Sequence, residues 1–485
     1  MFEEIQDQRM RLRLTAEEID RRIGAAPFGE QGKAWARRWL DVESYGQVGL
    51  ALFDVPPIVE RADNDILIDV DGKEYVDLLA GFSVSALGQC NEEVSRTIAK
   101  QAGKLIHYFD LPHPERIRMA ERLTEICPIA GERSRVVFGV TGADAVELAI
   151  RTARYVTGRP LILTAFGDYH GVTYSTMAVT GKGGMWPYFY PVPPLDTGVG
   201  YFPFPYPYQS PFGRAPQGVS DEAWCLDRLE DYFEYYFGSK ESPYREVKGN
   251  ITNVAAFVVE PFQSSAGYII PSPGYLKLLR RLCDKYGILL IVDEIQTGLG
   301  RTGKLWGCDW DDVEVDMLVT SKALGGGIPL SAVVARADLL EAWGPGAHVS
   351  TQAGNVLACA AGNKVLDVLT SPGFLDGVNE RGAHFAAGWK ELQERHALIG
   401  QIDARGIYLG IELVKDRETR EPAADEATFI LRECVREGMV FEKGGYFHNR
   451  FQLIPPLTIR KETINRAIEI FDRAFATASK QFGRA

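Results

Sequence analysis

The chain has 485 residues, and its 53 Lys and Arg against 65 Asp and Glu give a formal net charge of -12 and a pI near 5.3. Proteins that bind nucleic acid normally present a basic surface, and the one arginine cluster of note (Arg9, Arg11, Arg13) lies beside several acids, so we expect no nucleic-acid partner. The hydrophobic fraction of 46% and the length favour a folded globular protein with more than one domain.

Cysteine usage and hydropathy indicate the cellular compartment in which the protein works. The seven cysteines are scattered without CxxC spacing, which argues against a disulfide framework and a zinc site and favours a reducing compartment. The N-terminal MFEEIQDQRMRLR has no apolar signal core, and no stretch of about eighteen apolar residues occurs. We therefore expect a cytoplasmic protein with no membrane contact and no metal.

Residues 1–45 are charged and favour helix, and they carry no visible chemistry. From Pro57, the text PPIVERADNDILIDVDGKEYVD alternates apolar and polar residues around the turn dipeptides Asn64-Asp65 and Asp71-Gly72. This pattern predicts a small antiparallel meander.

The run RVVFGVTGADAVELAIRTARYV predicts a strand over 136–140, a Thr141-Gly142-Ala143 turn and then a helix. Free N–H groups and the dipole at the start of that helix would form an anion site, and Gly142 would let a phosphate approach the backbone. Strand-glycine-helix joints are common in α/β folds, so this joint alone is weak evidence.

A strand over 161–164 leads to FGDYHGVT, where Tyr169 stands at a strand end and could stack on a flat ring. We give His170 a supporting role, because a lone histidine is more often packed and hydrogen-bonded than an acid–base group. Residues 196–250 are dense in proline and aromatics, which predicts a long ordered loop and an acidic helix used for surface packing or dimer contact. A strand over 254–259 then ends at Glu260-Pro261.

Two further apolar runs, 288–292 and 317–319, show the unalternated pattern of strands buried in a parallel sheet. Asp293 closes the first run and Lys322 follows the second, so both side chains should face one crevice at the carboxyl ends of the strands. A buried lysine has a lowered pKa and can attack a carbonyl, which fits pyridoxal phosphate (PLP), whose ring nitrogen Asp293 would keep protonated. From these two residues alone, a structural ion pair remains the alternative.

The text VDEIQTGLGRTGKLWG, followed by LVTSKALGGGIPLSAVV, resembles the signature of class III (omega) aminotransferases, which are PLP enzymes of fold type I. The resemblance extends over about residues 55–475. It implies an α/β fold with a mostly parallel seven-stranded sheet sandwiched by helices, plus a smaller α+β domain. The implied division is an N-terminal extension with part of the small domain at 1–75, the large PLP-binding domain at 76–345, and the rest of the small domain at 346–485.

In this family the matching lysine forms the Schiff base and the matching aspartate pairs with the ring nitrogen, which implies Lys322 and Asp293 as catalytic residues. The cofactor-binding residues implied beside them are Thr141, Gly142, Ala143, Tyr169, His170, Glu260, Gln296 and Thr351. Thr351 would reach the cofactor phosphate bound by the neighbouring subunit, which implies a homodimer with active sites at its interface. Two such dimers could pair into a tetramer. Read alone, Thr351 could instead cap a helix.

The resemblance also suggests substrate-binding residues: Phe82, Ser83, Ser265, Arg405 and Arg450. Members acting on gamma-amino acids carry a glutamate at the position of Ser265 and an arginine at that of Gln452, so a dedicated 4-aminobutyrate enzyme is disfavoured. Arg450 lies two residues before Gln452 and on a strand would share its face, so we expect that it could reach the pocket. Arg405 resembles a structural or carboxylate-facing arginine of the family.

These features predict an aminotransferase that moves an amino group from a primary amine or omega-amino compound to pyruvate or 2-oxoglutarate by a ping-pong mechanism. A racemase, aminomutase or decarboxylase of the same family would share the site residues. The glycines at 325–327 could also suggest the dinucleotide-binding turn of an oxidoreductase. This alternative is disfavoured because no GxGxxG motif opens the first βα unit. A non-enzymatic scaffold is disfavoured by Lys322, Asp293 and Gly142.

Overall fold

The computed structural model describes residues 15–44, 55–182, 198–237 and 253–483. Its helices, with two short 3-10 segments labelled η, are α2 (Ala16–Ala25), α3 (Glu30–Val42), α4 (Ala80–Ser83), α5 (Glu92–Ala102), α6 (Pro114–Ile126), α7 (Gly142–Thr157), α8 (Tyr174–Val179), α9 (Asp221–Phe237), α10 (Tyr275–Tyr286), η4 (Cys308–Trp310), η5 (Lys322–Gly325), α11 (Ala337–Leu340), α12 (Val356–Leu369), α13 (Phe374–Arg395), α14 (Ala424–Arg436) and α15 (Lys461–Gln481). Its strands are β1 (Val59–Asp63), β2 (Ile66–Asp69), β3 (Glu74–Asp77), β4 (Ser134–Gly139), β5 (Leu161–Ala165), β6 (Val199–Phe202), β7 (Val254–Val259), β8 (Leu289–Asp293), β9 (Met317–Thr320), β10 (Ser331–Arg336), β11 (Ile399–Arg405), β12 (Tyr408–Leu413), β13 (Met439–Val440), β14 (Glu442–Gly444) and β15 (Arg450–Leu453).

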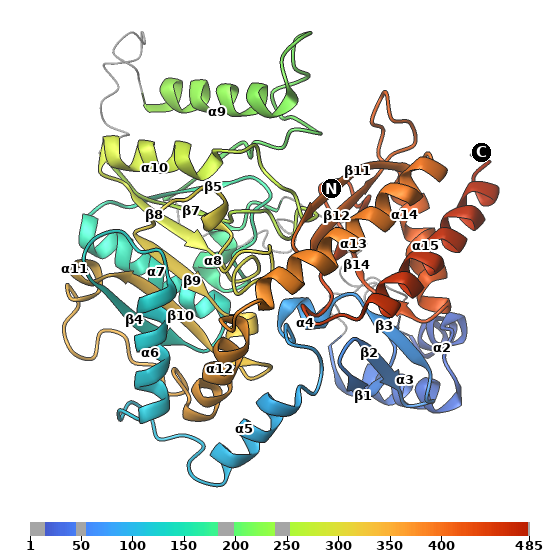
Figure 1. Cartoon of the computed structure of the whole chain (residues 1–485), viewed down its shortest axis with the longest axis horizontal. Coiled ribbons are helices and arrows are strands. Elements are labelled where there is room, and N and C mark those ends of the chain that lie inside the picture. The colour runs from blue at the N-terminus through green and yellow to red at the C-terminus, as the bar shows by residue number, and fades with distance from the viewer. Residues whose placement is uncertain (1–14, 45–54, 183–197, 238–252, 484–485) are drawn as a thin grey trace.

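A seven-stranded sheet with the order β4-β10-β9-β8-β7-β5-β6 forms the centre of the large domain (Figure 1). Only β10 runs antiparallel to its neighbours, and the remaining pairs are parallel. Every residue of β7, β8 and β9 is buried, as expected for strands covered on both faces. The predicted mostly parallel seven-stranded sheet is confirmed.

The edge strand β6 lies inside the stretch that the sequence predicted to be a loop. It pairs in parallel with β5 through residues 199–202. The following PYPY segment is also not limited to the surface, because Tyr206 is 4% exposed and its hydroxyl contacts Glu412 and Arg450. The expectation of a surface loop is therefore wrong for this part, since aromatics between prolines here fill the core.

The smaller part of the molecule combines segments from both ends of the chain. β1, β2 and β3 form the predicted antiparallel meander, and β13 adds to β3 in parallel. A second sheet, β11-β12-β15-β14, is antiparallel and lies beside α13, α14 and α15 (Figure 1). The domain boundaries given above remain predictions.

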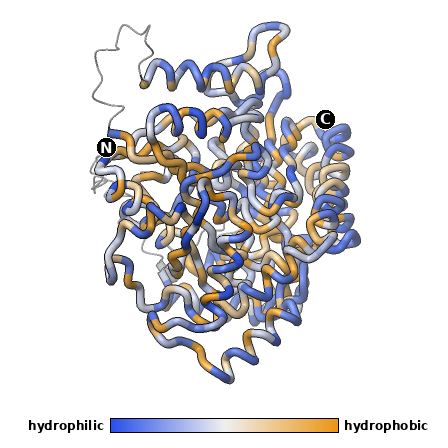
Figure 2. Tube along the Cα trace, turned by 60° about the vertical axis from the view of Figure 1, so that its left-hand side comes forward, coloured by the Kyte–Doolittle hydropathy of each residue, from blue (hydrophilic) through white to orange (hydrophobic). Residues whose placement is uncertain are grey.

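Hydrophobic residues follow the inner strands, whereas many outer helices alternate hydrophilic and hydrophobic residues along their length (Figure 2). On one face of the central sheet, α7 buries Ala145, Val146, Ala149 and Ala153 against β7 to β10. Within the described ranges, no helix is both long and apolar enough to cross a membrane.

The aromatic cluster on the other face of β7 provides a test of the core. Phe257 is fully buried, with ring centroids 5.6 Å from Phe202 and 5.4 Å from Phe233. We expect Phe257→Ala to lower the free energy of unfolding by about 3–5 kcal/mol, because it leaves a cavity and loses ring contacts. Urea denaturation measures this, and Val42→Ala, at an 81% exposed position, should change it by less than about 0.5 kcal/mol. Equal effects of the two substitutions would contradict this packing.

Candidate active site

Lys322 and Asp293 lie at the same edge of the central sheet. β8 and β9 are parallel neighbours in which Asp293 pairs with Val319, so both strands end at this edge. Lys322 begins the η5 turn with a φ of 45°, a strained left-handed backbone for a residue other than glycine. Its Nζ donates to Oε1 of Gln296, which follows Asp293 by three residues. The two residues therefore share one site, as the sequence predicted.

The Lys322 amine is surrounded by protein although part of the residue's surface stays exposed. Burial lowers its pKa from 10.5 to about 8, and Arg301 acts in the same direction. Asp293 and Glu260 oppose this shift but do not cancel it. A substantial fraction of the neutral, nucleophilic amine is thus present near neutral pH.

Asp293 is 3% exposed and is held by two donors. Nδ1 of His170 donates to its Oδ2 at 2.8 Å, and the backbone N–H of Ile295 donates to its Oδ1 at 3.0 Å. On the far side of the imidazole, Nε2 lies 3.3 Å from Oγ1 of Thr164. His170 therefore holds the Asp293 carboxylate in its orientation, and its supporting role toward the cofactor stays a prediction.

Two further buried carboxylates support the backbone around Tyr169. The N–H of Tyr169 donates to Oε2 of Glu260 at 2.9 Å, and the N–H of Glu260 donates to Oδ2 of Asp168 at 3.2 Å. Nε2 of Gln263 donates to Oδ1 of Asp168 at 2.8 Å. Burial raises the pKa of both carboxylic acids to about 8, and each is further raised by neighbouring carboxylates. These bonds fix the backbone of Tyr169 shortly after β5, and the residue is half-buried.

The N-terminus of α7 offers backbone donors. Thr141 is its N-cap, with Oγ1 accepting from the N–H of Asp144 at 3.2 Å, while its carbonyl accepts from Ala145. The N–H groups of Gly142 and Ala143 precede the intrahelical ladder and remain available. A Cβ at Gly142 would lie 2.7 Å from Cδ1 of Ile295, so a larger residue here would displace the end of that side chain.

Together these groups fit PLP. A buried amine suits its aldehyde, a fixed carboxylate suits its ring nitrogen, an aromatic ring suits its face, and free N–H groups at a helix start suit its phosphate. Gln296 is in contact with Lys322 and donates from Nε2 to the Tyr268 hydroxyl at 3.1 Å. The donor set therefore matches the cofactor expected from the sequence.

The segment carrying Phe82 and Ser83 is strained. Four consecutive residues have left-handed backbone, with φ values of 49°, 59°, 58° and 72° at Ala80, Gly81, Phe82 and Ser83. At the start of this run, the side chain of Asp77 accepts from the N–H groups of Leu79 and Ala80. Phe82 is 36% exposed, whereas Ser83 is buried and its Oγ accepts from Nε of Arg301 at 2.9 Å. Phe82 can thus line a cavity, and Ser83 positions an arginine behind it.

Arg301 is a site residue that sequence reasoning missed. Its side chain is 1% exposed, and Nη1 donates to the carbonyls of Ile407 and Pro455 at 3.2 and 2.5 Å. All of these partners are neutral, and burial lowers the pKa of Arg301 to about 10. The GRTG text marks a turn but does not reveal carbonyl partners more than one hundred residues away.

Arg450 does not have the expected role in substrate binding. It is 1% exposed, and its guanidinium bonds Asp403 at 2.6 Å and Glu412 at 2.7 Å. The remaining donors reach the Tyr206 hydroxyl and the carbonyls of Gly267 and Tyr268. Every nitrogen is occupied, so the arginine binds the small-domain sheet to the turn after β7 instead of a keto acid.

The other predicted residues lie as follows. Arg405 is exposed at the end of β11 and stacks on Trp310 at 5.2 Å, a placement that fits the structural alternative, and its contact with substrate stays a prediction. Thr351 is exposed before α12, whose N-cap is Asn355, so the helix-capping alternative does not hold. Ser265 is half-buried beside Gly444.

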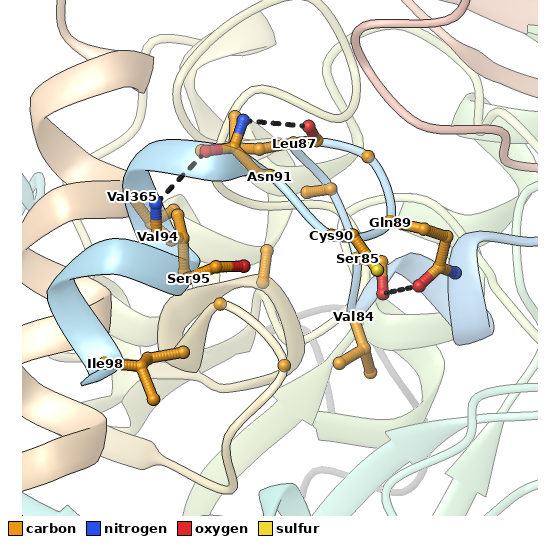
Figure 3. A pocket seen from close by; sticks show the side chains of 15 residues that line it. Val84, Ser85, Leu87, Gln89, Cys90, Asn91, Val94, Ser95, Ile98 and Val365 are labelled. Atoms are coloured by element: carbon orange, nitrogen blue, oxygen red, sulfur yellow. Dashed lines mark hydrogen bonds between the residues drawn. The ribbon is translucent and has the colours of Figure 1, made fainter. Parts of the chain in front are cut away.

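A pocket of about 190 Å³ lies behind the η5 turn (Figure 3). Its walls come from residues 84–91, from Val94, Ser95 and Ile98 of α5, and from the glycines of the lysine turn. Gln89 accepts from the Ser85 hydroxyl at 3.1 Å on one side of it. Neither Lys322 nor Asp293 lines this pocket, so it is separate from the site described above.

Comparison with known proteins agrees with this geometry. A model of the "Aminotransferase class-III" family matches residues 53–475. An alanine/serine racemase of Pyrococcus horikoshii is 33% identical, with 93% of this chain and 92% of that protein covered. A diaminobutyrate–2-oxoglutarate aminotransferase of Rhizobium meliloti is 34% identical, with 88% and 89% covered. The crystal structure of an amine transaminase from an uncultivated Pseudomonas species, in its PLP-bound form, superposes with a TM-score of 0.77 at 29% identity, covering 91% of this chain and 98% of that one.

The matched length includes every residue placed around Lys322, from the left-handed turn at Phe82 to the β14–β15 hairpin. The chain therefore belongs to the class III aminotransferases, a family of PLP-dependent transaminases of fold type I.

Proposed function

We propose that this transaminase moves the amino group of a neutral or cationic primary amine to a small keto acid, with Lys322 and Asp293 as the catalytic residues. The observation that carries this proposal is the buried Lys322 amine, with its pKa lowered to about 8, at the sheet edge where Asp293 also emerges. In this proposal the two residues have different tasks, Lys322 toward the aldehyde of the cofactor and Asp293 toward its ring nitrogen.

When bound, PLP supplies a carbonyl and an electron-withdrawing ring. Asp293 keeps the proton on the ring nitrogen, because its carboxylate is fixed by His170 and Ile295 and cannot turn away. The Lys322 amine, whose pKa of about 8 suits a base near neutral pH, would remove and return the proton at the substrate carbon. Gly142 and Ala143 would bind the phosphate through their N–H groups, and Tyr169 would pack on the ring.

The amine class follows from the charges near the site. The guanidinium of Arg450 is saturated by Asp403 and Glu412, while Gln452 and Ser265 are neutral. Arg450 therefore has no free guanidinium nitrogen to offer to a carboxylate at the far end of the donor. Thr351, exposed in front of α12, supports a homodimer in which it reaches the partner's phosphate.

An amino-acid racemase is the second candidate, and the similarity to the Pyrococcus horikoshii protein favours it. The same lysine could return the proton to either face of the substrate carbon. The two functions differ in their need for a keto acid, because a racemase leaves the amino group on its substrate.

Keto-acid dependence separates these two functions. We expect a primary amine to be converted to its carbonyl compound catalytically only when pyruvate or 2-oxoglutarate is present, and in a single enzyme equivalent when it is absent. The carbonyl product is measured by chromatography. Loss of optical purity of L-alanine without any keto acid would instead identify a racemase.

The lowered pKa of Lys322 predicts a pH profile for cofactor attachment. Only the neutral amine attacks the aldehyde, so the rate at which cofactor-free protein takes up PLP should rise with pH and level off above about 8. Stopped-flow absorbance measures this rate, and borohydride reduction should label wild-type protein but not Lys322→Ala. A rate that keeps rising to pH 10, as for an ordinary lysine, would contradict the burial of this amine.

Replacing Asp293 tests its role at the ring nitrogen. Asp293→Asn should lower the rate of the amine half-reaction at least about 10²-fold, because the ring loses a fixed charge that stabilises its protonated form. Borohydride should still attach the cofactor to Lys322. Asp284→Asn, which changes an exposed carboxylate on α10, serves as the control. An Asp293→Asn enzyme of normal rate would remove Asp293 from the mechanism.

A further inference from the structure

A tyrosine in the β14–β15 hairpin reaches from the second sheet to the central sheet, and the function proposed above does not use it. The hydroxyl of Tyr446 donates to the carbonyl of Phe166 at 2.7 Å and to Oε1 of Gln263 at 3.1 Å, so one proton is shared between two acceptors. Tyr446 lies between β14 and β15, whereas Phe166 directly follows β5 and Gln263 lies shortly after β7. This hydroxyl therefore joins the two sheets.

Glycines on both sides make room for this contact. Gly167 has a φ of 94°, and a Cβ at this position would overlap the hydroxyl oxygen of Tyr446. Gly445, with a φ of 91°, turns the hairpin immediately before the tyrosine. Burial raises the pKa of the Tyr446 hydroxyl, and the nearby carboxyl group of Asp168 acts in the same direction. The hydroxyl thus keeps its proton near neutral pH and stays a hydrogen-bond donor.

Gln263 extends the contact to the turn formed by residues 166–170. Its side chain is fully buried, and Nε2 donates to the carbonyl of Phe166 at 2.7 Å and to Oδ1 of Asp168 at 2.8 Å. Both N–H groups of the amide are then in use, and its oxygen accepts from Tyr446. The amide cannot rotate without losing these bonds, so it fixes the first part of the turn to the hairpin.

The last two residues of the same turn, Tyr169 and His170, lie at the site. The N–H of His170 donates to Oγ1 of Thr180 at 3.1 Å, and its ring holds Asp293 as described above. Tyr169 is the residue expected to pack on the cofactor. Because both residues follow Asp168 directly, a shift in the first part of the turn would move the tyrosine ring and the imidazole behind Asp293.

We infer that Tyr446 is a positioning residue for the reaction, because its hydroxyl and Gln263 together hold the turn of residues 166–170. This turn in turn places His170 against Asp293. The inference rests on the proposed aminotransferase function and adds a residue of the second sheet to the support of the aspartate. A movement of the hairpin relative to the central sheet is thereby transmitted to the site.

Tyr446→Phe removes the hydroxyl but keeps the ring, so it tests these hydrogen bonds alone. In the purified full-length protein we expect the amides of residues 167–170 to exchange with deuterium about two- to tenfold faster, the range that one hydrogen bond gives. Peptides from β7 should exchange at the wild-type rate, which separates a local change from general destabilisation. Mass spectrometry of proteolytic fragments measures both rates.

The amine half-reaction of the holoenzyme provides the second readout. Tyr446→Phe should slow it about two- to tenfold. In a His170→Phe background the same substitution should change it less than about twofold, because the turn then no longer acts on Asp293. Tyr155→Phe changes an exposed tyrosine of α7 and is the matched control, which should leave both measurements at their wild-type values.

Unchanged amide exchange at residues 167–170 in Tyr446→Phe would overturn the inference. Equal slowing of the half-reaction by Tyr446→Phe in the wild-type and His170→Phe backgrounds would also overturn it. If the wild-type holoenzyme converted no amine, the proposed function would fail, whereas the exchange measurement would still decide whether Tyr446 holds the turn.

Discussion

The register of two parallel strands is the constraint on which the site depends. Because β8 and β9 are adjacent and Asp293 pairs with Val319, an acid and an amine leave the sheet at one edge, within the protein and away from bulk water. Desolvation lowers the pKa of the Lys322 amine and so makes it reactive, and the surrounding charges determine how far the pKa falls. Glu260 moderates the effect and Arg301 strengthens it, so the reactivity of Lys322 reflects a balance among buried charges and not one partner alone.

The two buried arginines show how the same residue type can serve opposite purposes. Arg450 lies between Asp403 and Glu412, and although burial disfavours its charge, its acidic neighbours and Tyr206 raise its pKa. Arg301 has only a hydroxyl and two carbonyls, and its pKa falls. The charge of Arg450 is therefore neutralised within the fold, whereas Arg301 leaves positive charge near Lys322.

The sequence predicted the features that depend on local pattern. Unalternated apolar runs located β7, β8 and β9, and the residues that end them located the site. It did not predict β6, because a proline- and aromatic-rich stretch has no strand periodicity. Nor did it predict the saturation of Arg450: alternation along a strand indicates the face of a side chain, but its partners at 403 and 412 are brought to it by the sheet β11-β12-β15. Arg301 was missed for the same reason, since its acceptors are distant in the chain.

The pairing of β3 with β13 has a consequence for how the protein assembles. It joins residues 76–77 to residues 439–440, so the N-terminal meander cannot complete its sheet until most of the chain has been synthesised. Contacts this far apart in sequence form late, because a long loop must close first. The turn that carries Phe82 follows β3 directly. This turn is thus expected to reach its final position only after the central sheet has formed. A ribosome-bound chain would hold an unpaired β3 edge that chaperones could protect.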